Sequence, residues 1–150
     1  MPPRPRSTRP ARRSRSSPKP GAIEVRGRLV RGLGEAAGFT QLPWVLQQCR
    51  EKLGFEPYPG TVNLKVLPAD MPAWQELQRQ PGAILSPPDQ AFCDAVCHLV
   101  LIQGQVRGAT IVPHVAGYPT DKLELLAPEP IVAALGLAIE QQVSVRLIER

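Results

Sequence analysis

The chain has 150 residues, of which 43% are hydrophobic, with a formal net charge of +5 and three cysteines. This length suits one domain with a real core, no apolar run is long enough to cross a bilayer, and the cysteines are too few for a disulfide scaffold. We therefore expect a single folded domain without a membrane span, in a reducing, cytoplasmic setting.

The charge is distributed unevenly along the chain. Residues 1–20 contain seven basic side chains, no acidic ones and six prolines, whereas the remaining residues carry 11 basic and 13 acidic side chains. A segment so poor in apolar residues cannot bury enough surface to fold, so residues 1–20 are predicted to be a disordered basic tail and residues 21–150 the folded domain. The tail is either a solvated extension or an arm that contacts RNA, DNA or another polyanion.

The first strand and helix of the domain are predicted from its N-terminal third. Residues 22–30 alternate between apolar and charged side chains, which is typical of a half-buried strand. A glycine-rich loop follows at 32–38. A helix is predicted over 43–53, because Pro43 suits a first helical position and Gly54 supplies a stop.

The middle of the chain predicts a second strand. Residues 56–60 are expected to form a turn that leads into a strand over 61–67. Around Trp74 and Leu77 we expect at most a short helix. Residues 81–89, which contain three prolines and a glycine, are expected to form a loop.

The last third predicts mostly strands. The apolar run 92–102 and residues 105–112 are joined by a Gln-Gly turn, which indicates a hairpin. A short strand is expected at 122–126, a short helix at 130–136 and a final strand at 143–148. These consecutive strands predict a mainly β fold, a small closed or partly closed six-stranded β-barrel with two or three short helices.

The glycine-rich loop leaves two interpretations open. Residues 32–37 fit the pattern GxGxx[GA], but a dinucleotide-binding fold needs a helix that begins inside the motif, and Gly38 and Pro43 are expected to prevent it. Either the backbone N–H groups of the loop, with Arg28 and Arg31 beside them, bind phosphate, or the glycines serve a tight turn.

The strand over 61–67 carries a candidate metal site. Thr61, Asn63 and Lys65 are two residues apart and therefore project from one face, while the apolar residues between them face the core. A hydroxyl and an amide oxygen suit Mg²⁺, but without a carboxylate on this face the metal would have to arrive with a polyphosphate. Lys65 adds a positive charge nearby. The alternative is an ordinary polar face.

The cysteines and histidines predict no zinc site. On a strand, Cys93 and Cys97 lie about 13 Å apart, too far to share one ion, and other ligands are scarce. We expect both to be buried small apolar side chains. His98 beside them is expected to be structural, and His114 is the better candidate to lie near a ligand.

Three segments resemble the CTP-dependent riboflavin kinases best known from archaea. They are GRLVRGLGEAAGFTQLP, KLGFEPYPGTVNLKV and LELLAP, and the similarity runs from about Val25 to about Ile148. The resemblance implies a cradle-loop β-barrel and transfer of the γ-phosphate of CTP to the 5′-hydroxyl of riboflavin, giving FMN and CDP, with Mg²⁺ as the metal. We expect a monomer whose partners are these small molecules.

The resemblance also implies site residues. Thr61 and Asn63 match the positions that hold Mg²⁺, and Glu124 matches a flavin contact that is our candidate to orient or deprotonate the hydroxyl. Ala116 matches a second flavin-contacting position. Two segments match nucleotide contacts: Arg28, Leu29, Val30, Arg31, Gly32 and Leu33, and Glu129, Pro130, Ile131 and Val132.

Three positions depart from the family pattern. An Arg-Thr pair before the flavin acid aligns with Val115 and Ala116, an arginine aligns with Val132, and an Asp-Gly-Asp motif aligns with residues 140–142. Each lost hydrogen bond to a neutral group costs about 1 kcal/mol. Three functions therefore stay open: an active kinase, a non-catalytic flavin- or nucleotide-binding regulatory barrel, and a nucleic-acid-associated protein that acts through its tail.

Overall fold

The computed structural model describes residues 22–148 apart from residues 33, 35 and 91. The predicted tail, residues 1–20, and its contact with a polyanion lie outside the described residues and stay predictions. The elements in chain order are β1 (Glu24–Val30), α1 (Ala36–Thr40), α2 (Pro43–Leu53), β2 (Val62–Val66), the 3₁₀ turn η1 (Pro68–Asp70), α3 (Met71–Arg79), β3 (Ala83–Leu85), β4 (Ala95–Ile102), β5 (Val106–Pro113), β6 (Lys122–Leu126), α4 (Ile131–Ala134) and β7 (Gln142–Leu147).

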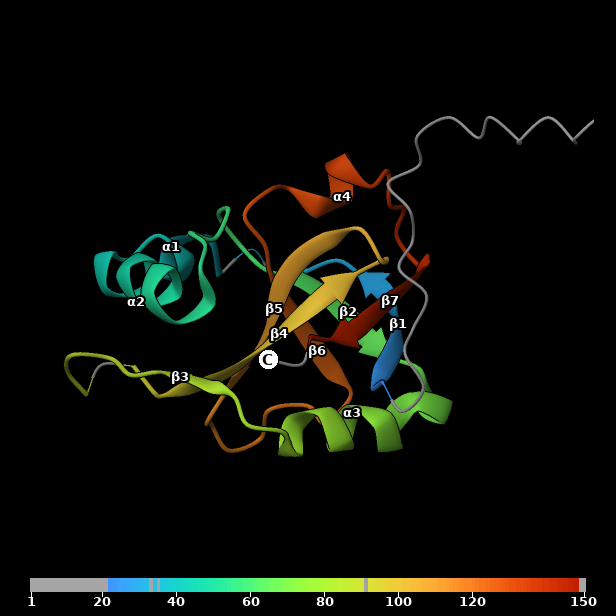
Figure 1. The fold of residues 1–150 in the computed structure, drawn as a ribbon, viewed down its shortest axis with the longest axis horizontal. Helices are drawn as coiled ribbons and strands as arrows, with labels where there is room; N and C mark the ends of the chain where they lie inside the picture. The colour runs from blue at the N-terminus through green and yellow to red at the C-terminus, as the bar shows by residue number, and fades with distance from the viewer. Residues whose placement is uncertain (1–21, 33, 35, 91, 149–150) are drawn as a thin grey trace, which may run out of the picture.

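Six antiparallel strands close into a barrel (Figure 1). Their order is β4–β5–β6–β2–β1–β7, and β7 pairs with β4 to complete the circle. The predicted six-stranded β-barrel is therefore confirmed. The antiparallel pairing also excludes a dinucleotide-binding fold, which needs parallel strands. Closure pairs each barrel strand on both sides over at least part of its length, which protects strand edges.

Two local predictions are confirmed at the residues where they were made. The helix α2 begins at Pro43 and is followed by Gly54, whose φ of +83° ends it in a left-handed conformation. The hairpin of β4 and β5 turns at Gln103 and Gly104, and both have positive φ angles, 54° and 65°. Such a pair of positive angles matches the twist of the two strands that the turn joins.

Two expectations about short elements are wrong. Residues 81–89 contain the strand β3, which pairs with the outer edge of β4, a contact that local sequence does not reveal. A short helix, α1, does begin inside the glycine-rich motif and runs through Gly38. The short helix expected around Trp74 and Leu77 is confirmed: α3 has nine residues, and both side chains are buried.

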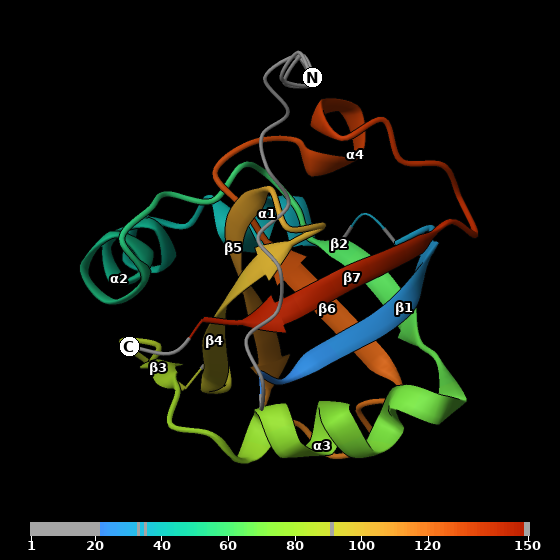
Figure 2. The ribbon, with the colours of Figure 1, turned by 45° about the vertical axis from the view of Figure 1, so that its right-hand side comes forward.

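The core has two parts, which Figure 2 helps to follow. The barrel interior is closed at one end by α3, through the buried side chains of Trp74 and Leu77, while α4 lies at the opposite end. A second cluster lies between α2 and the outer surface of the sheet, where Val45, Cys49 and Leu53 pack. The helix α2 therefore anchors the loop that precedes it against the outside of the barrel.

The cysteines divide between core and surface. Cys97 is buried as expected, but Cys93 is exposed, contrary to our expectation. Burial raises the pKa of the Cys49 thiol to about 11, so this thiol is neutral at physiological pH.

Among the described residues no helix is long and apolar enough to span a bilayer.

We expect Asp70→Asn to lower the thermal midpoint by a few degrees at neutral pH. Nε and Nη2 of Arg26 donate to the two carboxylate oxygens of Asp70 at 2.8 and 2.9 Å, which ties β1 to the start of α3. These bonds lower the pKa of the Asp70 carboxyl. The stabilisation is therefore present above the unfolded-state pKa of about 3.9 and is lost as the pH falls through the lower folded-state value.

Circular dichroism melts between pH 2.5 and 7 measure this effect. The difference in midpoint between wild type and Asp70→Asn should shrink as the pH falls below about 4. Glu56→Gln is the control, because both side chains of the Arg50–Glu56 pair are more than half exposed and water screens it. Equal effects of the two substitutions would contradict a structural role for the Arg26–Asp70 pair.

Candidate functional site

Neighbouring strands bring one row of residues together on the outer face of the barrel. Val30 of β1 lies opposite Asn63 of β2, and Asn63 lies opposite Glu124 of β6. Directly opposed residues of antiparallel strands project to the same side, so the side chains of Asn63 and Glu124 face the same way. Thr61 is two residues from Asn63 and joins this face.

These side chains line a cleft of about 590 Å³ on the outside of the sheet. The loop after β1, the turn before β2 and the ends of β5 and β6 enclose it. The lining residues are Gly32, Gly34, Ala36, Ala37, Phe39, Pro59, Gly60, Thr61, Asn63, Phe92, Cys93, Ala95, Ile111, Pro113, Lys122 and Glu124.

Glu124 is the centre of a polar network at one end of the cleft. The hydroxyl of Thr61 donates to Oε1 of Glu124 at 2.9 Å, and the hydroxyl of Tyr118 donates to Oε2. Nζ of Lys122 lies 3.9 Å from Oε2. An ionised carboxylate accepts about four hydrogen bonds, so Glu124 keeps acceptor sites for a ligand.

Tyr118 and Lys122 were not predicted as site residues. Burial and the hydrogen bond to Glu124 raise the pKa of the Tyr118 phenol, so it stays protonated and can donate. Nζ of Lys122 also lies 5.4 Å from the centroid of the Tyr118 ring. One signal was available: Lys122 and Glu124 are two residues apart on a predicted strand and therefore share a face.

The amide of Asn63 is enclosed by the glycine-rich loop. Asn63 is only 8% exposed, and its Nδ2 donates to the carbonyl of Thr61 at 3.3 Å. Within the described residues no donor bonds to its Oδ1. A Cβ atom on Gly32 would lie 2.5 Å from Nδ2, so any larger residue at this position would displace the amide.

The donor set fits a hard divalent cation. Thr61 and Asn63 offer a hydroxyl and an amide oxygen, and the hydroxyl hydrogen already points to Glu124, which leaves lone pairs of Thr61 for a metal. Among the described residues there is no group of three His, Cys, Asp or Glu side chains that would hold a metal alone. A cation here would need further oxygen ligands from water or phosphate.

Part of the cleft lining is aromatic. The rings of Phe39, Trp44 and Phe92 lie with centroids 5.8 to 6.0 Å apart. Phe39 and Phe92 line the cleft, and Phe92 is 43% exposed. Such a surface is suited to stack a planar ligand with an extended ring system. The cleft therefore combines aromatic side chains and a carboxylate among its lining residues.

The two predicted nucleotide segments line hollows that adjoin the cleft at different residues. Residues 129–132 line a hollow of about 210 Å³ that shares Gly60 and Thr61 with the cleft. Residues 30–32 line another of about 310 Å³ that shares Gly32 and Asn63 with the cleft.

Other predicted positions do not lie in the cleft. Ala116 and His114 are exposed and are not among its lining residues. Leu33 lies outside the described residues. His98 is buried, and its Nε2 donates to the carbonyl of Gln80 at 2.7 Å, which gives it the structural role expected from the sequence.

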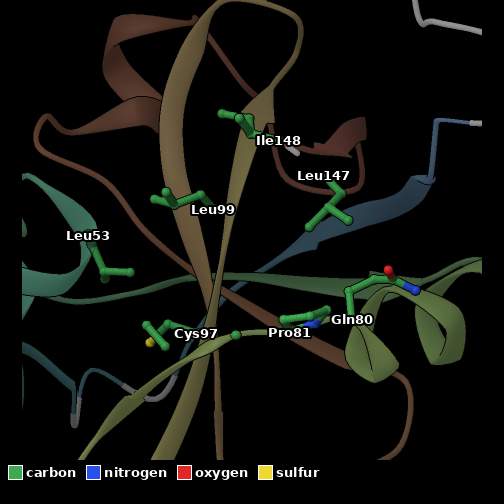
Figure 3. A pocket seen from close by; sticks show the side chains of 9 residues that line it. Leu53, Gln80, Pro81, Cys97, Leu99, Leu147 and Ile148 are labelled. Atoms are coloured by element: carbon green, nitrogen blue, oxygen red, sulfur yellow. The ribbon is translucent and has the colours of Figure 1, made fainter. Parts of the chain in front are cut away.

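A fourth hollow, of about 420 Å³, lies elsewhere on the sheet (Figure 3). Figure 3 shows Leu99 and Cys97 of β4 on one side of it and Leu147 with Ile148 at the end of β7 on another. Among the described residues, none with an acidic or basic side chain lines it. We therefore place the candidate site in the cleft, where the titratable side chains lie.

Residues 29–147 match the family model of the CTP-dependent riboflavin kinase domain, whose description is "Domain of unknown function DUF120". The chain is 33% identical to a riboflavin kinase of Archaeoglobus fulgidus over 131 residues, covering 85% of the chain and 56% of the relative. It is 36% identical to one of Methanocella arvoryzae, covering 85% and 58%. It is 34% identical to one of Pyrobaculum arsenaticum, covering 85% and 61%. The chain thus spans less than two thirds of the length of these relatives.

Proposed function

The chain belongs to the CTP-dependent riboflavin kinase family, and from this premise we propose that it transfers the γ-phosphate of CTP to the 5′-hydroxyl of riboflavin, giving FMN and CDP. The observation that carries the proposal is the hydrogen bond from Thr61 to Glu124 beside Asn63. It places a carboxylate next to two neutral metal-binding oxygens, at the polar end of a cleft with an aromatic wall.

We propose one orientation for riboflavin in this cleft. Its planar ring system matches the aromatic lining formed by Phe39 and Phe92, and the ribityl chain then extends toward Glu124. Glu124 accepts a hydrogen bond from the 5′-hydroxyl and orients the hydroxyl oxygen for in-line attack. Tyr118 and Lys122 hold the Glu124 carboxylate in place while it does so.

The nucleotide approaches from the other side of Thr61. We assign the cytidine to the hollow along residues 129–132 and the triphosphate to the hollow along residues 30–32, where β1 ends. Thr61 and Asn63 would hold Mg²⁺, which neutralises charge on the phosphate oxygens when bound. Holding both substrates in a reactive geometry supplies about 7–11 kcal/mol of the barrier.

The departures from the family pattern lie away from the Thr61–Glu124 network. Val115 and Ala116 are exposed outside the cleft, and Val132 is 39% exposed in the nucleotide hollow. Glu140 lies 4.0 Å from Arg28, so its segment borders the nucleotide loop. These changes affect substrate affinity more than the chemical step.

The unpaired cysteines are compatible with the cytoplasmic setting that we propose for the reaction.

An FMN assay tests the proposal. The protein is mixed with riboflavin, Mg²⁺ and each of CTP, ATP, GTP and UTP, and FMN is quantified by chromatography. FMN formed with CTP alone is the expected result. Failure to form FMN with any nucleotide, together with tight binding of riboflavin, would instead indicate the second candidate, the non-catalytic flavin-binding barrel.

We expect Gly32→Ala to lower kcat roughly fivefold, because the added methyl group displaces the amide of Asn63 and the loop above it. Gly38→Ala is the matched control. A Cβ at Gly38 meets nothing within 4 Å, and alanine favours the helix α1. Steady-state kinetics compare the two variants, and equal rates would show that the loop does not position Asn63.

A further inference from the structure

Thr40 is the last residue of α1, and the proposed reaction assigns it no role. Its side chain is polar, yet the exposed fraction of the residue is 0%. Removing a hydroxyl from water costs free energy unless the hydroxyl forms hydrogen bonds inside the protein. The bonds that Thr40 forms therefore indicate what its hydroxyl does in this fold.

The hydroxyl of Thr40 joins two walls of the cleft. Its Oγ1 donates to the carbonyl oxygen of Ala37 at 3.1 Å and accepts a hydrogen bond from the N–H of Gly60 at 2.9 Å. Ala37 and Gly60 both line the cleft, the first from α1 and the second from the turn before β2. One side chain thus holds the turn against the helix across 20 residues of the chain.

The bond to Gly60 bears on Thr61, the next residue. The paired part of β2 begins at Val62, so Thr61 lies outside the paired residues of the ladder. Gly60 has a φ of +95°, and a Cβ atom there would meet nothing within 4 Å. Side-chain packing therefore does not fix the backbone of Gly60, and its N–H group is the point at which the fold holds it.

Two further hydrogen bonds hold the same turn, but they lie earlier in the chain. Nε2 of Gln41 donates to the carbonyl oxygen of Pro57 at 3.0 Å, and the N–H of Tyr58 donates to the carbonyl oxygen of Ala127 at 2.7 Å. Both anchors lie at least two residues before Gly60. Apart from contacts among the site residues themselves, the bond from Gly60 to Thr40 is the anchor nearest to Thr61 in the described part of the chain.

We propose that Thr40 is a positioning residue for the kinase reaction: its hydroxyl holds Gly60, and through it places Thr61 beside Glu124. The inference rests on the proposed function. Thr40 does not line the cleft, so it acts through Gly60 and not on a substrate. Because Gly60 and Thr61 line both the cleft and the hollow assigned to cytidine, their placement decides how the two substrates meet.

Thr40→Val tests the proposal because it removes the hydroxyl and keeps the shape of the side chain. The N–H of Gly60 then has no acceptor, Thr61 shifts, and kcat for FMN formation should fall about tenfold. The KM for riboflavin should change little, since the aromatic residues of the cleft stay in place. Calorimetry with and without Mg²⁺ should show a smaller gain in CTP affinity from the metal, a readout that needs no turnover.

Hydrogen exchange measured by NMR reports on the hydrogen bond itself. The Gly60 amide should exchange slowly in wild type and about tenfold faster in Thr40→Val. Thr40→Ser loses the methyl group but keeps the hydroxyl, so it should retain both slow exchange and wild-type kcat. If kcat of Thr40→Ser fell tenfold, packing of the methyl group would be responsible and the proposal would be overturned, even where Thr40→Val fails to fold.

The matched control is Thr110→Val. Thr110 is also 0% exposed, and its Oγ1 accepts a hydrogen bond from the N–H of His98 at 3.2 Å, but it lines none of the four hollows described above. Thr110→Val should lower the thermal midpoint, as Thr40→Val does, because each leaves a buried N–H group without its acceptor. Its kcat and its response to Mg²⁺ should stay at wild-type values; an equal fall of kcat in both variants would indicate a general loosening and overturn the proposal.

Failure of the proposed function gives a different result from failure of this inference. If wild type forms no FMN with any nucleotide, the function is wrong and the positioning role falls with it, however slowly the Gly60 amide exchanges. If wild type is active and Thr40→Val keeps the wild-type kcat, only the role of Thr40 is wrong.

Discussion

Glu124→Gln should lower kcat for FMN formation about 100-fold while changing the KM for riboflavin little. The substitution keeps the shape of the side chain but removes the charge that orients the substrate hydroxyl. It also replaces one acceptor oxygen with an NH₂ group, so the hydroxyls of Thr61 and Tyr118 no longer both find acceptors. The effect therefore falls on the chemical step rather than on binding of the flavin ring.

Steady-state and single-turnover kinetics measure the effect, and thermal melting checks that the variant is folded. Tyr118→Phe is the graded control: it removes one hydrogen bond to Glu124 and keeps the carboxylate, so a loss of a few-fold is expected. A Glu124→Gln enzyme with wild-type kcat would show that another group orients the hydroxyl, and the assignment of Glu124 would be wrong.

Sequence pattern predicted the parts of the fold that depend on neighbours in the chain. Pro43 and Gly54 mark both ends of α2, and the turn at Gln103 and Gly104 joins the predicted hairpin. The alternation that put Thr61 and Asn63 on one face also agrees with the observed register. Each of these features is decided within a few residues, so a single sequence suffices to find it.

The features that the sequence did not reveal depend on pairing between residues that are far apart in the chain. The strand β3 exists because residues 83–85 pair with β4, and nothing in its proline-rich surroundings signals that pairing. The contact between Thr61 and Glu124 joins residues 63 apart in the chain. Strand alternation singled out Thr61, only the family resemblance suggested Glu124, and only the register of β2 against β6 explains why they meet.

The same register suits the two substrates that we propose. The row of Asn63 and Glu124 lies beside a basic row, Arg28, Lys65 and Lys122, and shares the cleft with Phe39 and Phe92. The proposed ring system and polyphosphate would therefore meet separate surfaces that adjoin the polar network. Because a shift of one residue would turn every side chain to the other face, the site depends on this register being fixed by the barrel.

Asn63→Ala should lower kcat by at least about tenfold and abolish the gain in CTP affinity that Mg²⁺ provides. The amide oxygen of Asn63 is one of two neutral oxygens that would hold the cation, and its removal leaves Thr61 as the single protein ligand. Binding of CTP without metal depends on the loop and the basic row, so it should be the same in variant and wild type.

Calorimetric titrations of CTP with and without Mg²⁺, on wild type and Asn63→Ala, separate a metal ligand from a structural residue. A metal ligand affects only the titration with Mg²⁺, whereas a collapsed loop around Gly32 would weaken both. Thr61→Ser is the matched control because it keeps the hydroxyl that donates to Glu124 and should bind like wild type. Equal weakening of Asn63→Ala in both titrations would remove Asn63 from the metal site, because the amide would then support the loop rather than the cation.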